Sequence, residues 1–131
     1  MCEINRFKEK KEIEVFKVVY EKNENLYSLF YNFELTIGKV EEKNYKYVKK
    51  YLAKNWNLDM RGKVSGFEKL ESAEKLLKFA KKNIKYPNLQ IIKLKLGGLL
   101  YRGSTLGMLD FLYNGTEKIY AGTEILEIFK N

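Results

Sequence analysis

Residues 72–96, SAEKLLKFAKKNIKYPNLQIIKLKL, hold the clearest structural pattern in the chain. In residues 72–85 apolar side chains recur every three or four positions and trace one helical stripe, while lysines take the opposite side. Ser72 is suited to cap the start of this helix, and Pro87 follows its end. In residues 89–96 apolar side chains alternate with lysine, which is typical of a strand. The stretch therefore predicts a helix followed by a strand.

The sequence on either side predicts further strands and helices. Residues 13–20 and 26–37 are rich in β-branched and aromatic side chains, so we expect them to pair as an antiparallel hairpin. Residues 44–54 repeat apolar side chains at helical spacing and predict another main helix. After a turn or bulge at Gly97-Gly98 we expect a continuing strand, a short third helix and two closing strands, at residues 99–102, 104–113, 119–121 and 124–129.

The order of these elements indicates the fold class. Strands and helices do not alternate regularly along the chain, so a doubly wound parallel sheet is not expected. We expect an α+β fold, with a mostly antiparallel sheet, two main helices and a short third. At 131 residues the chain is long enough for one core, which predicts a single domain over residues 1–131.

Two residue types that commonly carry chemistry are scarce. The chain has one cysteine, Cys2, and no histidine, so it lacks an intrachain disulfide and the usual zinc and copper ligands. We expect no metal and no cofactor. Nucleophiles activated by histidine are also unavailable, so an enzyme would have to use carboxylates, Tyr, Lys or Ser alone. Because no catalytic base is evident, we expect no catalytic residue and no enzyme activity. No apolar run reaches the length of a membrane span and no signal peptide is evident, which predicts a cytoplasmic protein without a membrane partner.

Positive charge is concentrated in the middle of the chain. The formal net charge is +8, and residues 39–95 carry sixteen basic and six acidic side chains, a local net charge of +10. Such a segment attracts a nucleotide, a nucleic acid or another polyanion. A solvated lysine-rich face explains the same composition, and both interpretations stay open.

Arginine is rare and stands in distinctive places. Of 25 basic residues three are arginine, and Arg61 and Arg102 each precede a glycine in loop-like sequence. Guanidinium groups bind phosphate or carboxylate through two parallel hydrogen bonds, which lysine cannot do. A neighbouring glycine lets the backbone approach a ligand closely. The two residues favour an anionic ligand, although ordinary surface arginines beside turns fit the same pattern.

Aromatic and small polar residues surround these arginines in the sequence. Aromatic rings stack on bases, and hydroxyl groups add finer contacts. The candidate ligand-binding residues are Arg61, Arg102, Phe67, Tyr101, Trp56, Lys63, Ser104 and Thr105. Residues such as Phe67 and Trp56 are more often core residues than stacking platforms.

A carboxylate-based enzyme is an alternative. Glu124 and Glu127 near the end of the chain invite comparison with the catalytic glutamate of ADP-ribosyltransferases, which act without metal or histidine. The first predicted strand carries no arginine, and no Ser-Thr-Ser element precedes the glutamates. These two residues fit solvent-facing strand positions equally well. A basic nucleic-acid-binding protein is the other alternative, although such surfaces generally use arginine freely.

Short stretches in a fixed order resemble a known group of phage proteins. They are Phe16–Tyr20 (FKVVY), Tyr27-Ser28, Ile37-Gly38-Lys39, Gly66-Phe67, Ser72-Ala73-Glu74 and a hydrophobic strand near the end of the chain. In this order they resemble the first described family of Thoeris anti-defence proteins. Members of that family sequester cyclic ADP-ribose isomers made by bacterial TIR-domain enzymes and are not enzymes themselves.

The resemblance implies a function and a site. The chain would be a phage-encoded nucleotide sponge in the host cell cytoplasm, acting against TIR-based immune signalling. Arg61 and Arg102 would hold the phosphates, and Phe67 or Tyr101 would stack on adenine. Family members are oligomeric, so we expect a homo-oligomer, with an aromatic patch at Phe111, Tyr113, Tyr120 and Phe129 as its interface.

Overall fold

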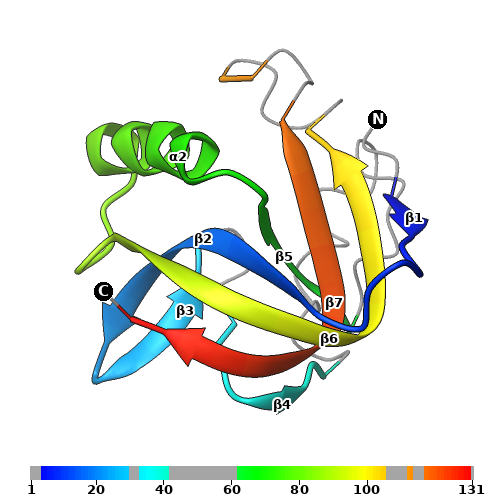
Figure 1. Ribbon diagram of the computed structural model, residues 1–131. Coiled ribbons are helices and arrows are strands. Elements are labelled where there is room, and N and C mark those ends of the chain that lie inside the picture. Colours follow the sequence, from blue (N-terminus) through cyan, green and yellow to red (C-terminus); the bar gives the residue numbers. More distant parts are fainter. Residues whose placement is uncertain (1–3, 30–32, 42–61, 106–111, 114–116, 131) are drawn as a thin grey trace.

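The computed structural model of the chain describes residues 4–29, 33–41, 62–105, 112–113 and 117–130 (Figure 1). Strands make up 53% of these residues, and α2 is the one helix among them. In chain order the elements are β1 (Ile4–Arg6), β2 (Ile13–Lys22), β3 (Asn25–Ser28), β4 (Gly38–Lys39), β5 (Val64–Phe67), α2 (Leu70–Asn83), β6 (Gln90–Ser104) and β7 (Lys118–Phe129).

Four strands close into a small barrel-like ring. β6 pairs with β7 along one edge, and along its other edge with β2 and then β1. β5 lies between β7 and β2, so the order β6-β2-β5-β7 returns to β6 (Figure 1). β3 extends β2, and β4 extends β7. Every pairing among the described strands is antiparallel.

β6 bends sharply at Gly97-Gly98 and continues. The register with β7 shifts between Lys95 and Leu96 and again between Gly97 and Leu100. Gly98 has φ +72°, a left-handed conformation that glycine adopts without strain. The Leu99 N–H leaves the ladder and donates to Thr123 Oγ1 at 2.9 Å. The predicted bulge at Gly97-Gly98 and the continuing strand are confirmed, and this bend lets one strand serve two walls of the ring.

The ring closes where β2 and β5 cross at very short distance. Their ladder consists of one pair, Phe16 opposite Phe67. A Cβ on the neighbouring Gly66 would lie 2.5 Å from Val15 Cγ2 and 2.9 Å from the Phe16 carbonyl oxygen, so this position requires glycine. Beside the pair, Lys17 Nζ donates to the Ser65 carbonyl at 2.8 Å.

Two hydrophobic clusters lie on opposite sides of the ring wall. The first combines side chains from all four ring strands, among them Val15, Val64, Leu94 and Ile125, and therefore fills the inside. The second lies between the ring and α2, which covers one side of it (Figure 1). Ala73, Leu76 and Ala80 form the buried stripe of the helix, as the apolar spacing predicts.

The start of α2 differs from the expectation. The helix begins at Leu70, and Lys69 occupies the N-cap position without a side-chain cap hydrogen bond. Ser72 lies within the first turn, where its hydroxyl donates to the Glu117 carboxylate. The expected N-cap role of Ser72 is therefore wrong, because a tertiary acceptor competes for its hydroxyl.

The expected hairpin is confirmed, with a shorter second strand. β2 and β3 pair in register, with Tyr20 opposite Tyr27. Asn23 and Glu24 between them both have positive φ, as a two-residue type I′ turn requires. The second strand ends at Ser28, not at residue 37.

The expected α+β fold class, with two main helices and a short third, is wrong. The protein is mostly β, with a barrel-like sheet. The predicted helix over residues 44–54 lies outside the described residues. Of the predicted third helix, Ser104 belongs to β6, and residues 106–111 lie outside the described residues. The two closing strands are one continuous strand, β7, which passes through Gly122. The glycines bend long strands here instead of ending them.

Candidate functional site

The predicted ligand-binding residues do not form one group. Arg61 and Trp56 lie outside the described residues. Phe67 is 7% exposed and packs against Tyr113 in the core beneath α2. Thr105 is fully buried, and its N–H and Oγ1 form hydrogen bonds with the backbone of Glu117. In this structure Phe67 and Thr105 contribute to the stability of the fold.

Tyr101 and Arg102 point to opposite faces of the sheet. Arg6 of β1 and Ala121 of β7 lie directly opposite Tyr101, whereas Tyr120 lies opposite Arg102. Successive side chains of a strand alternate between the two faces. The two neighbours therefore belong to two different groups.

The first group, the Tyr101 cluster, consists of Arg6, Lys63 and Tyr101. The Arg6 guanidinium carbon lies 5.5 Å from the centre of the Tyr101 ring, and Lys63 Nζ lies 4.8 Å from it. Arg6 comes from β1 and Lys63 from the residue before β5, on opposite sides of β6. Two segments far apart in sequence thus bring cations to one aromatic ring.

The electrostatics of the Tyr101 cluster favour an anion. The negative face of a tyrosine ring attracts a cation, and both Arg6 and Lys63 lie within cation–π distance of the Tyr101 ring. Lys63 is 7% exposed, so its ammonium is largely removed from water. Arg6 is exposed and has no carboxylate partner among the described residues. A guanidinium that lies over a ring keeps its N–H edges available for an oxyanion.

The second group, the Phe7 cluster, consists of Arg102, Phe7, Tyr120 and Glu68. The Arg102 guanidinium lies 5.3 Å from the Phe7 ring, and that ring lies 5.5 Å from the Tyr120 ring. The Tyr120 hydroxyl donates to the Glu68 carboxylate at 2.8 Å. Burial raises the pKa of Tyr120, and its hydrogen bond to Glu68 adds to the rise. Because this group already contains a carboxylate, it suits an anion less well than the Tyr101 cluster.

Ser104 ends β6 opposite Lys118 of β7, three positions beyond Tyr101. The glycines before it bend the strand, as described above. Of the eight predicted residues, the structure therefore brings Tyr101 and Lys63 into contact, and it places Arg102 next to them in sequence but on the other face.

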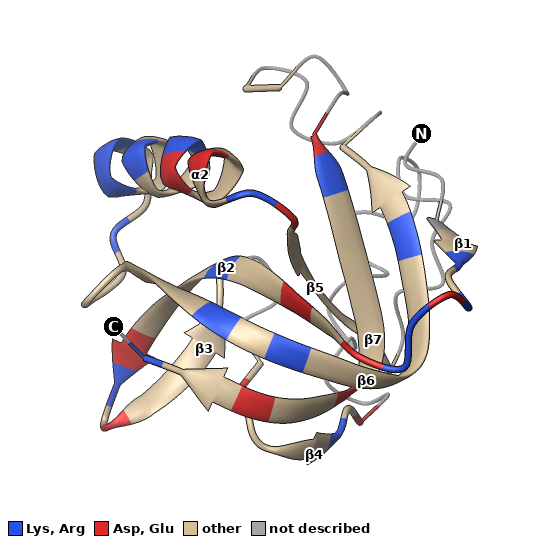
Figure 2. Ribbon diagram, viewed as in Figure 1, with Lys and Arg blue, Asp and Glu red and all other residues tan. Residues whose placement is uncertain are grey.

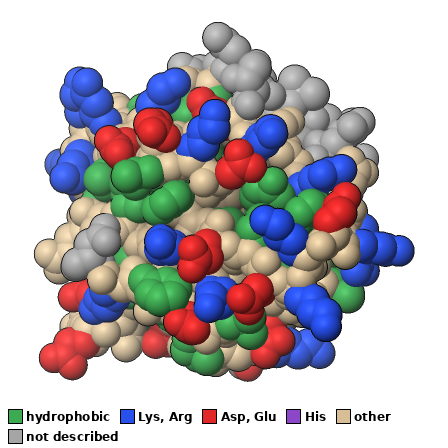
Figure 3. All heavy atoms as spheres, viewed as in Figure 1, with side chains coloured by type: hydrophobic (Ala, Val, Ile, Leu, Met, Phe, Trp, Pro, Cys, Tyr) green, Lys and Arg blue, Asp and Glu red, His purple; other side chains and the backbone are tan. Residues whose placement is uncertain are grey.

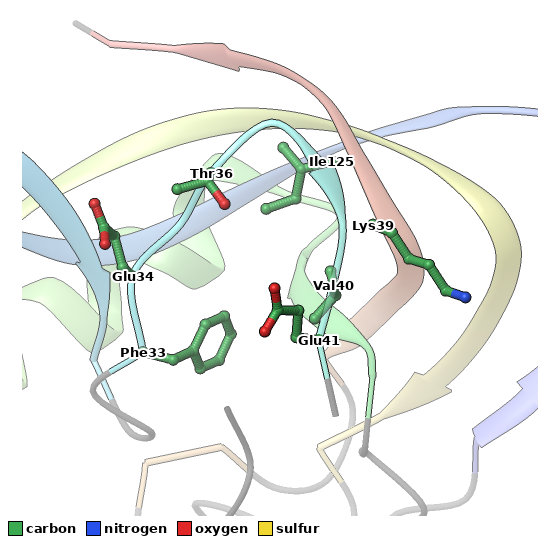
Figure 4. A pocket seen from close by; sticks show the side chains of 7 residues that line it. All are labelled: Phe33, Glu34, Thr36, Lys39, Val40, Glu41 and Ile125. Atoms are coloured by element: carbon green, nitrogen blue, oxygen red, sulfur yellow. The ribbon is translucent and has the colours of Figure 1, made fainter. Parts of the chain in front are cut away.

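A small pocket opens at the end of the ring near β4. Its volume is about 210 Å³, and its lining is Phe33, Glu34, Thr36, Lys39, Val40, Glu41 and Ile125 (Figure 4). The two glutamates outnumber the single lysine. This balance of charge does not suit a phosphate.

A hydrogen-bonded group fixes α2 to the rest of the fold. The Tyr113 hydroxyl donates to the Ser72 carbonyl, and the Ser72 hydroxyl donates to Glu117. Lys75 Nζ lies 3.6 Å from the same carboxylate. Burial raises the pKa of Tyr113. Ser72 is 2% exposed, so this buried group anchors the helix. Tyr113 is also too buried to form the oligomer patch suggested by the sequence.

The described lysines of the basic segment lie mostly on solvated surfaces. Figure 2 shows them along α2, with acidic residues in its first turns. On the outer face of the sheet, Lys93 pairs with Glu14, and Lys95 pairs with Glu12 and Glu127. Figure 3 shows acidic and basic side chains intermingled on the face in view. On the face in view the described side chains do not form a continuous cationic track for a nucleic acid backbone.

Sequence reasoning missed Arg6 and Phe7. Both lie in residues 1–12, a charged stretch without the length or alternation that predicts a strand. The available signal was the adjacent basic-aromatic pair Arg6-Phe7, which has the same composition as Tyr101-Arg102. Arg6 lies directly opposite Tyr101 across β1 and β6, and the N–H of Phe7, which follows β1, donates to the Leu100 carbonyl at 2.8 Å.

No protein-family model, curated protein or solved structure matches the chain. The resemblance to anti-Thoeris proteins rests on the short stretches quoted above. Among the described residues no helix is long and apolar enough to cross a membrane. In the same part of the chain no group of three acidic or cysteine side chains is placed to hold a metal ion.

Proposed function

We propose that the protein binds a small anionic nucleotide without altering it, and that the Tyr101 cluster contacts its phosphates. The observation that carries this proposal is the convergence of Arg6 and Lys63 on one tyrosine ring. An oxyanion beside the ring would be attracted by the exposed Arg6 guanidinium and by the nearby positive charge of Lys63. Charge-assisted hydrogen bonds to phosphate are also among the strongest that proteins form.

The Arg6 guanidinium gives the site its geometric preference. Its planar fork matches two oxygens of one phosphate, and the ring beneath it restricts its orientation. Lys63 adds a point charge from the other side of β6. Arg61 precedes Lys63 by two residues in the sequence, so the earlier hypothesis of an arginine at the phosphates stays part of the proposal.

The resemblance to the anti-Thoeris family suggests the identity of the ligand. A cyclic ADP-ribose isomer carries phosphates and an adenine, which are the groups that cations and aromatic side chains recognise. On this proposal the protein is a sponge that removes an immune signal in the host cell cytoplasm, and it acts as a homo-oligomer. Light scattering that gives the monomer mass of 15.5 kDa would contradict the oligomer.

The experiment that tests the proposed function analyses the ligand directly. The purified protein is incubated with cyclic ADP-ribose, separated from free ligand and denatured, and the extract is examined by mass spectrometry. We expect an intact nucleotide, released in proportion to the protein. A hydrolysed or transferred product that forms at a rate proportional to the protein would instead indicate the transferase alternative.

A matched control separates a site from a diffuse charge effect. Lys78 lies exposed on α2, and Lys78→Ala removes one positive charge without touching the Tyr101 cluster. We expect this variant to bind the nucleotide like the wild type. If Lys78→Ala and Arg6→Ala weaken binding equally, the positive charge acts as a field, and the nucleic-acid alternative is favoured.

A further inference from the structure

Arg6 reaches the Tyr101 cluster on a short arm of the chain. β1 has three residues, and among the described strands it pairs with β6 alone. Of residues 5–12, which β1 and the link to β2 comprise, Phe7 is the one whose side chain is buried. A segment with few buried apolar contacts opens locally at a low cost in free energy. The position of Arg6 therefore depends on what holds Phe7.

Phe7 is held by the hydrophobic cluster that fills the ring, of which it is a member with 7% of its side chain exposed. Its N–H donates to the Leu100 carbonyl at 2.8 Å, and its ring lies 5.5 Å from the Tyr120 ring. The Tyr120 hydroxyl donates in turn to the Glu68 carboxylate at 2.8 Å, which restricts the orientation of that ring. The arm is thus anchored at the residue that follows Arg6.

We propose that Phe7 is a positioning residue of the anion site, because its burial holds β1 on β6 and thereby keeps Arg6 beside the Tyr101 ring. The inference rests on the proposed function and adds a coupling between nucleotide binding and docking of the arm. An arm that leaves β6 takes Arg6 with it, whereas Lys63 and Tyr101 belong to other segments and stay. Such coupling is reciprocal, so a ligand that contacts Arg6 stabilises the docked arm by the factor by which docking strengthens binding.

Arg102 contributes less to this anchor than the Phe7 ring does. Its guanidinium lies 5.3 Å from the centre of that ring, but the Arg102 side chain is exposed. A cation–π contact at an exposed site is weak compared with the burial of a whole aromatic ring. Loss of the Arg102 side chain should therefore leave the arm docked, whereas loss of the Phe7 ring should release it.

The affinity that is lost with the anchor has an upper limit. The apparent affinity falls in proportion to the fraction of molecules whose arm is docked. A molecule with an undocked arm lacks the Arg6 contact, so Phe7→Ala should weaken binding by no more than Arg6→Ala does, or up to about ten- to a hundredfold. For the same reason the double variant should bind like Arg6→Ala alone.

Calorimetric titration of cyclic ADP-ribose into the wild type, Arg6→Ala, Phe7→Ala and the double variant tests this coupling. The two single losses should not add, because both remove the same contact. Phe7→Leu keeps a buried apolar side chain and should restore most of the affinity. The matched control is Leu26→Ala, which shortens a side chain of the same hydrophobic cluster on β3 and should leave the affinity unchanged. Circular dichroism establishes that each variant is folded.

Hydrogen exchange measures docking of the arm without any change to the core. The Phe7 N–H is bonded to the Leu100 carbonyl, so it exchanges with solvent when the arm leaves β6. Cyclic ADP-ribose should slow exchange in a peptide that covers residues 4–7 of the wild type. It should not slow exchange there in Arg6→Ala, and the β2–β3 hairpin, residues 19–28, serves as the internal reference in both proteins.

The outcomes distinguish the two proposals. A Phe7→Ala variant that is folded and binds like the wild type would overturn the role of Phe7 and leave the anion site standing. So would a double variant that binds more weakly than Arg6→Ala, because Phe7 would then act independently of Arg6. A wild type that does not bind the nucleotide would remove the proposed function and, with it, the role of Phe7.

Discussion

Tyr101 and Arg102 are neighbours in the sequence but point to opposite faces of the sheet, because they are consecutive residues of β6. The Tyr101 ring lies beside the cations of Arg6 and Lys63, whereas the Arg102 guanidinium lies beside the Phe7 ring. This division separates a cationic group from a group of mixed charge. We therefore assign the proposed phosphate contact to Arg6 and not to Arg102.

Gly66→Ala should destabilise the fold. The added Cβ would meet Val15 at 2.5 Å and the Phe16 carbonyl oxygen at 2.9 Å, and the backbone cannot yield as a side chain can. Overpacking of this kind lowers the free energy of unfolding by about 1–3 kcal/mol in a urea titration. The neighbouring Ser65→Ala keeps its carbonyl and should change stability by less than about 0.5 kcal/mol. Equal effects in both variants would contradict a tight crossing of β2 and β5.

Ser72→Ala should loosen the attachment of α2. The hydroxyl of Ser72 donates to the Glu117 carboxylate, and a hydrogen bond to a charged group contributes about 1.5–3 kcal/mol. We expect a loss of that size in the free energy of unfolding. Glu74→Ala, on the exposed side of the same turn, is the control and should have little effect. A Ser72→Ala variant as stable as the wild type would show that this hydrogen bond does not hold the helix.

The stability of Lys17→Met relative to the wild type should depend on pH. The pKa of Lys17 falls from 10.5 in the unfolded chain to about 8 in the folded protein. Between these two pH values the unfolded state binds more protons than the folded state, so the wild type gains stability from this group as the pH rises. Below about pH 8 the penalty of burying the charged side chain is fully present. Methionine has no such dependence.

Urea titrations of both proteins at pH 7 and pH 10 measure this difference. We expect the free energy of unfolding of Lys17→Met, relative to the wild type, to decrease between the two pH values. A constant difference would mean that Lys17 has an ordinary pKa in the folded protein. Other groups titrate equally in the two proteins and cancel in the comparison.

The sequence predicts local structure well where one period dominates. The α2 stripe, the β2–β3 hairpin and the bulge at Gly97-Gly98 follow from apolar spacing and turn residues alone. The sequence predicts two strands on either side of Gly122 where the structure has the single strand β7, because a glycine that bends a strand and one that ends it have the same local signature. Closure of the ring depends on Phe16 opposite Phe67, a contact between distant segments that no local pattern contains.

The candidate site was predicted in part for the same reason. Lys63 and Tyr101 stood out by composition, and the structure brings them together. Arg6 was passed over, because β1 has three residues and a strand of that length shows no alternation. The face to which Arg102 points follows from the register of β6, which the sequence does not specify.

The central claim is that the Tyr101 cluster, and not Arg102, contacts the phosphates. It is tested most directly by calorimetric titration of cyclic ADP-ribose into the wild type, Arg6→Ala and Arg102→Ala. Arg6→Ala should weaken binding about ten- to a hundredfold, through loss of one or more charge-assisted hydrogen bonds, and Arg102→Ala should stay within about threefold of the wild type. An Arg102→Ala variant weakened as much as Arg6→Ala, or a wild type that does not bind the nucleotide, would contradict it.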